Sequence, residues 1–76
     1  MTSPDPESIP VTIHVNGEPV TVAAASTVSD LVEQYGLARA ACAVEVNRQL
    51  VPRAHHGTHA LAGGDVVEIV TLVGGG

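Results

Sequence analysis

The C-terminal end of this chain holds the residues best suited to chemistry. The run "VVEIVTLV" at 66–73 passes directly into Gly74, Gly75 and Gly76, which would carry a free carboxylate. Adenylation by ATP would make one of its oxygens part of a good leaving group. Glycine lets a backbone enter a narrow channel, because it has no side chain and adopts any φ. The glycines therefore predict a tail that threads into another enzyme's nucleotide site, with a frayed end or a cloning remnant as the alternative.

Three histidines form the other conspicuous cluster, "HHGTH" at His55, His56 and His59. Two histidines four residues apart suit a metal when they share one face of a helix. Glycine and threonine separate them here, and no carboxylate or thiol is close in the sequence. We therefore expect a solvated loop and no metal site.

The single cysteine, Cys42, lies among alanines and valines. A reactive thiol needs an exposed, electropositive setting, and one cysteine cannot form an internal disulfide. The acids are scattered, and no glycine-rich loop joins a strand to a helix as a phosphate site requires. The residues therefore predict no catalytic site, and a carrier or partner protein rather than an enzyme.

The length and net charge of the chain further limit the class of protein to which it can belong. A chain of 76 residues holds one domain with a thin core. Its net charge of −5 argues against binding to nucleic acid, which needs a basic surface. The same charge favours binding to a basic patch on a partner protein. Without a basic and apolar leader or an apolar run of transmembrane length, we expect a cytoplasmic protein that binds no membrane.

The first half of the chain predicts a hairpin and a helix. "VTIHV" at 11–15 alternates as a half-buried strand does, and Asn16–Gly17 predicts a type I′ turn. Pro19 places the following strand at an edge. A helix is predicted over 26–36, with Thr27 as its N-cap and Gly36 as its left-handed end. Its apolar stripe comprises Val28, Leu31, Val32 and Tyr35.

The second half predicts strands at 42–47 and 48–53, a loop with at most one helical turn, and a long central strand at 66–73. The expected fold class is α+β: a β-grasp, or ubiquitin-like, mixed sheet of four to five strands packed on one helix. The first and last strands should lie side by side in its middle. Residues 1–8 are expected to be a disordered lead, 9–73 the domain and 74–76 a flexible tail.

These features resemble the ubiquitin-like sulfur carriers, and among them the ThiS family of thiamin thiazole biosynthesis. The resembling segments span nearly all of 11–76, and "NRQLVPR" is the most specific piece. The terminal Gly-Gly marks only the wider class. Departures are the additional Gly74 and the lead. The segments are "VNGEPV" at 15–20, "TVSDLVEQYGL" at 27–37, "VEVNRQLVPR" at 44–53 and "GGDVVEIVTLVGGG" at 63–76.

The resemblance implies that Gly76 carries the reactive carboxyl and that Gly75 threads it. An E1-like adenylyltransferase (ThiF-like) would adenylate Gly76 with Mg and ATP, and a persulfide or sulfide donor would replace AMP. The thiocarboxylate would then give its sulfur to a thiazole synthase (ThiG-like). The carrier would be a cosubstrate with no permanently bound cofactor.

Alternation predicts which face meets these partners. Val67 and Ile69 should face the helix, whereas Val70 and Leu72 should point outward beside Glu68. Apolar residues on an open sheet face often mark a docking site. The predicted docking residues are Glu68, Val70, Leu72 and Val73, unless a loop or a dimer covers them.

Other readings of the same tail stay open at this point. A small subunit of molybdopterin synthase, or a sulfur carrier of another pathway, would use the same chemistry with a different acceptor. A ubiquitin-like modifier would join its tail to lysines of target proteins. A plain interaction module would leave the tail inert.

Overall fold

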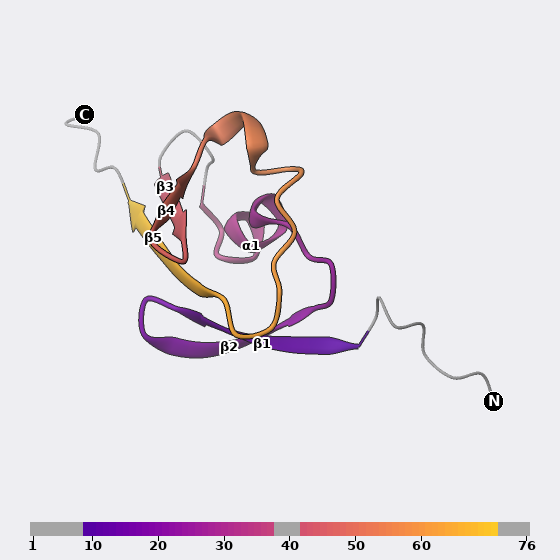
Figure 1. The fold of residues 1–76 in the computed structure, drawn as a ribbon. Coiled ribbons are helices and arrows are strands. Elements are labelled where there is room, and N and C mark those ends of the chain that lie inside the picture. The colour runs from indigo at the N-terminus through magenta and orange to yellow at the C-terminus, as the bar shows by residue number, and fades with distance from the viewer. Residues whose placement is uncertain (1–8, 38–41, 72–76) are drawn as a thin grey trace.

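A computed structural model describes residues 9–37 and 42–71. They form a mixed sheet in the order β2-β1-β5-β3-β4, with one helix lying against one face (Figure 1). The sheet and helix confirm the expected β-grasp architecture. The predicted lead and glycine tail lie outside the described residues. The elements are β1 Pro10–Val15, β2 Glu18–Ala23, α1 Val28–Gln34, β3 Cys42–Val46, β4 Gln49–Val51, the 3₁₀ turn η3 Arg53–His55 and β5 Val66–Thr71.

Two hairpins of the same kind flank the central strand. Asn16 and Gly17 have φ of 50° and 86°, as the predicted type I′ turn requires. Asn47 and Arg48 also have positive φ, 52° and 69°, and join β3 to β4. The sequence analysis placed the two strands there but missed this turn, because arginine is not a residue that favours the left-handed region.

The helix begins as predicted and ends sooner. The Thr27 hydroxyl accepts from the Asp30 N–H, and the Asp30 carboxylate accepts from the Thr27 N–H at 2.9 Å. This reciprocal pair is a capping box. Gly36 has φ of 71° and ends the helix. Tyr35 does not join the apolar stripe: it is the C-cap and 42% exposed, because the helix stops before the stripe returns to the core.

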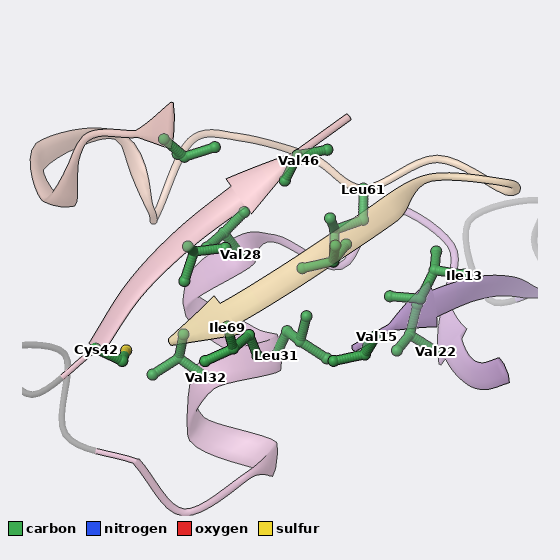
Figure 2. Packing of buried hydrophobic residues seen from close by; sticks show 13 residues of the cluster. Ile13, Val15, Val22, Val28, Leu31, Val32, Cys42, Val46, Leu61 and Ile69 are labelled. Atoms are coloured by element: carbon green, nitrogen blue, oxygen red, sulfur yellow. The ribbon is translucent and has the colours of Figure 1, made fainter. Parts of the chain in front are cut away.

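The central position belongs to β5, as expected. It runs parallel to β1, with His14 opposite Val66, and antiparallel to β3 on its other side. Figure 2 shows the apolar cluster between the sheet and α1. Val, Leu and Ile dominate it, and Cys42 belongs to it as predicted. The buried apolar residues are Ile13, Val15, Val22, Val28, Leu31, Val32, Cys42, Val44, Val46, Val51, Leu61, Val67 and Ile69.

The histidine loop is not wholly solvated, and in this the sequence prediction was wrong. His56 is 1% exposed, and its Nε2 lies 3.1 Å from the carbonyl oxygen of Val51. The backbone explains why the loop packs down. The carbonyls of His56 and His59 accept from the N–H groups of Ser29 and Val28 at 2.8 and 3.0 Å. These are free amides of the first helical turn, which need partners from outside the helix.

Candidate functional site

The predicted docking residues fall on and beyond β5. Val67 and Ile69 are buried towards α1, whereas Glu68 and Val70 are exposed on the opposite side of the sheet, as alternation predicted. Leu72, Val73 and the three glycines Gly74, Gly75 and Gly76 lie outside the described residues. Their predicted roles in docking, threading and activation therefore stay predictions.

Neighbouring strands extend this exposed surface. Ala43 of β3 lies opposite Val70, and Glu45 lies opposite Glu68. Leu50 of β4 lies opposite Glu45 in turn, and is 63% exposed. Directly opposite residues of an antiparallel pair point to the same face. We call this surface the outer face: Ala43, Glu45, Leu50, Val66, Glu68 and Val70.

The outer face combines exposed apolar side chains with a pair of acids. Val66 and Val70 are 49% and 54% exposed. Glu45 and Glu68 face each other across β3 and β5, and like charges directly opposite repel. A partner that brings a basic group to this pair would relieve the repulsion. The sequence analysis missed Glu45 and Leu50, although alternation through the β3–β4 hairpin would have placed both.

Two asparagine side chains hold β5 in place. The Asn16 Oδ1 accepts from the Ile69 N–H at 2.9 Å, and its Nδ2 donates to the Ile69 carbonyl at 3.2 Å. On the other side of the strand, the Asn47 Oδ1 accepts from the Val66 N–H at 3.0 Å. Side chains from both flanking hairpins thus bond β5, Asn47 at its first residue and Asn16 at Ile69. The sequence analysis assigned Asn16 only a turn.

The family model described as the ThiS family matches residues 13–76. The chain belongs to the ThiS family. It is 33% identical over 64 residues to the sulfur carrier protein ThiS of Escherichia coli, covering 84% of this chain and 97% of that protein. Its fold matches the crystal structure of the thiamine biosynthesis protein ThiS from Geobacter metallireducens with a TM-score of 0.73. The identity there is 32%, over 87% of this chain and all of that one.

Two longer relatives add to this ThiS assignment. A thiazole synthase of Magnetococcus marinus is 39% identical over 64 residues, and one of Paramagnetospirillum magneticum is 37% identical over 62. The matches cover 84% and 82% of this chain. The chain spans only about a fifth of the length of these thiazole synthases, 20% and 19%. Proteins named for thiazole synthesis therefore contain a segment similar to this ThiS family member.

The remaining candidates for chemistry in this ThiS family member are structural. Cys42 is a buried free thiol, which suits the predicted packing role. A cavity of about 160 Å³ lies where β4 leaves β3. Its lining includes Cys42, His56 and Arg53.

Within 9–37 and 42–71, no three His, Cys, Asp or Glu side chains come together as a metal site. No helix in those ranges is long and apolar enough to cross a membrane.

Proposed function

We propose that this chain is the sulfur carrier of thiazole formation in thiamin biosynthesis, with the sulfur held as a thiocarboxylate on Gly76. The observation that carries the proposal is the ThiS family match over 13–76, which includes the terminal glycines. The relative from Escherichia coli, named a sulfur carrier protein, is matched over almost its whole length. The chain is therefore a carrier and cosubstrate, not an enzyme.

The carrier works through a cycle of activation and discharge. An E1-like adenylyltransferase (ThiF-like) binds Mg and ATP, and the Gly76 carboxylate attacks the α-phosphate and expels pyrophosphate. A sulfur donor then delivers a hydrosulfide equivalent to the acyl adenylate, and AMP leaves. The carbon–sulfur bond of the resulting thiocarboxylate is broken when thiazole forms, and the carboxylate returns. No cofactor stays bound to the carrier, and we place the cycle in the cytoplasm.

The glycines give the tail the shape that activation needs. Gly74 and Gly75 carry no side chains, so the backbone can pass between the walls of a nucleotide site. The strand before them supports this role. β5 lies between β1 and β3: it is paired with β1 at its first two residues and with β3 as far as Thr71. A fixed base with a thin tail presents one reactive group at a defined point.

The outer face is the proposed docking surface for the activating enzyme and the synthase. It offers exposed Val70 and Leu50 around the carboxylates of Glu45 and Glu68. Interfaces take most of their binding energy from a few residues, and complementary charges fix the orientation of the partners. The docking role predicted for Leu72 and Val73 is part of this proposal.

The synthase partner is the ThiG-like thiazole synthase. Support comes from the two thiazole synthases that contain a segment similar to this chain. Joining a carrier and its acceptor in one polypeptide raises their effective concentration, which favours a pair that works in one reaction sequence. The same observation favours thiazole over the molybdopterin or other acceptors.

Intact-mass measurement tests the function. The protein is incubated with the ThiF-like enzyme, Mg-ATP and sulfide, and its mass should rise by one oxygen-to-sulfur exchange. A variant lacking Gly76 is the control and should not change. Addition of the ThiG-like synthase and its small-molecule substrates should return the original mass. A covalent adduct with other proteins would instead indicate a modifier, and an unchanged mass would indicate an inert module.

A further inference from the structure

We propose that Asn16 is a positioning residue for the reactive tail, acting through the backbone of Ile69. The inference rests on the proposed function of Gly76 and adds a residue that sets its approach. Asn16 belongs to the β1–β2 turn, 53 residues before Ile69 in the chain. Its side chain nevertheless makes two hydrogen bonds to the strand that leads into the tail.

The pairing of β5 explains why these bonds matter. β1 is paired with β5 at only two positions, His14 with Val66 and Val15 with Val67. β3 continues along the other side as far as Thr71. Strand β1 therefore ends while β5 still has four residues to run. Past that end, the β1 side of β5 needs another partner for its backbone groups.

Asn16 supplies that partner with peptide-like geometry. Its backbone N–H donates to the Val67 carbonyl at 2.9 Å, which continues the ladder by one step. Its side-chain amide then takes the place of the next strand residue, since it accepts from the Ile69 N–H and donates to the Ile69 carbonyl. Among the described residues, this amide is the last hydrogen-bond partner on the β1 side of β5. It therefore fixes the direction in which the strand leaves the sheet.

The second hairpin offers a matched comparison within the same molecule. Asn47 occupies the same place in its turn, with φ of 52° against 50° for Asn16. Its side chain also bonds β5, accepting from the Val66 N–H and donating to the Asp65 carboxylate at 3.0 Å. These contacts are at the start of β5, whereas those of Asn16 are near its end. Both asparagines thus occupy a hairpin turn and bond β5 through their side chains, but the Asn16 contacts are closer to the tail.

The test compares Asn16→Gly with Asn47→Gly. Glycine tolerates the positive φ that each turn requires, and each substitution removes the side-chain amide with the same gain in backbone freedom. The initial rate of pyrophosphate release by the ThiF-like enzyme with Mg-ATP is measured against carrier concentration. For Asn16→Gly we expect kcat to fall about tenfold, the order of effect of losing two neutral hydrogen bonds. Its KM should stay within about twofold, because the outer face still sets binding.

Separate measurement of kcat and KM distinguishes a positioning role of Asn16 from a loss of folding stability. A carrier that is partly unfolded lowers its own effective concentration, which raises the apparent KM and leaves kcat at saturation unchanged. Asn47→Gly should keep the kcat of the original chain. Faster amide hydrogen exchange at Ile69 in Asn16→Gly alone would report the loosened strand directly.

Four outcomes overturn the inference. An unchanged kcat for Asn16→Gly, or an equal fall for both variants, would leave Asn16 as a turn residue only. A rise in KM alone would assign the effect to stability. If the unaltered chain is not adenylated at all, the proposed function fails first and the positioning role fails with it.

Discussion

At the scale of single residues, hydrogen bonds made at element ends organise much of this small domain. Thr27 and Asp30 cap α1 reciprocally, while His56 and His59 accept from the next amides through their carbonyls. Asn16 and Asn47 do the same for β5 with their side chains. Apart from the local Thr27–Asp30 pair, these contacts join segments that are distant in the sequence, so single substitutions there should have measurable effects.

The N-cap gives the first prediction. Thr27→Ala removes the hydroxyl that accepts from the Asp30 N–H, and a lost N-cap costs about 1 kcal/mol. We expect the free energy of unfolding in urea to fall by that amount. Thr27→Ser keeps the hydroxyl and should stay close to the original chain. Equal stability of all three proteins would mean that the cap contributes nothing.

His56 gives the second prediction. A buried imidazole donates from Nε2 to the Val51 carbonyl, because that oxygen can only accept. His56→Leu leaves the carbonyl without this partner, which costs about 1–3 kcal/mol of unfolding free energy. His55→Leu, at an exposed neighbour, should change it by less than about 0.5 kcal/mol. A comparable loss in both variants would contradict the assigned difference in burial.

At the scale of elements, the two faces of the sheet differ in burial. The inner face buries Val44, Val67 and Ile69 against α1, and the outer face leaves Leu50 and Val70 in solvent. Isolated exposed apolar residues need no explanation, but here they share one face with the tail-bearing strand. The division between the buried face and the proposed docking face follows from the period of two along each strand.

The outer face gives the third prediction. Val70→Glu adds a third carboxylate beside Glu45 and Glu68 and removes an apolar anchor. We expect the KM for the carrier in adenylation to rise about tenfold or more, the effect of truncating an interface anchor. Tyr35→Glu is the control, since Tyr35 is similarly exposed but lies at the end of α1. An unchanged KM with Val70→Glu would remove this strand from the docking surface.

Most elements of this fold were predictable because local signals and burial agreed. Asn16–Gly17, Pro19 and the nearly continuous apolar run at 66–73 led to the correct turn, edge and centre. The Asn47–Arg48 turn was missed, because its left-handed arginine is stabilised by the pairing of β3 with β4. The burial of His56 was missed for a related reason. It depends on the first turn of α1, a segment distant in sequence.

Of the candidate site, the outward direction of Val70 was predictable, because alternation along one strand is a local feature. The chemistry of the glycine tail stays a prediction. The hydrogen bonds between Asn16 and Ile69 could not be predicted, because the two residues are 53 positions apart in the sequence. In these bonds the side-chain amide of a turn residue takes the place of a strand backbone. Contacts between residues so far apart in the sequence can be predicted only when the register of the strands in the sheet is known.

At the scale of the whole molecule, charge should guide the carrier to its partners. The chain has a net charge of −5, and the outer face contributes Glu45 and Glu68. Opposed charges on a partner raise the association rate more than the final affinity, and salt screens them over roughly 8 Å at physiological ionic strength. The association rate constant with the ThiF-like enzyme should therefore fall as salt rises.

The double variant Glu45→Gln, Glu68→Gln gives the last prediction, because it separates the outer face from the overall charge. It relieves the repulsion across β3 and β5, so the free energy of unfolding should stay equal or rise slightly. Stopped-flow association with the ThiF-like enzyme should nevertheless become slower and less dependent on salt. Glu18→Gln, Glu33→Gln is the control. It removes two exposed acids from β2 and α1, and so makes the net charge less negative by the same amount as the first double variant. If the two double variants lose the same rate and the same salt dependence, net charge alone steers the carrier. A loss confined to the first would locate the recognition at the acid pair, where a basic group of the partner would sit between the strand that carries the tail and its neighbour.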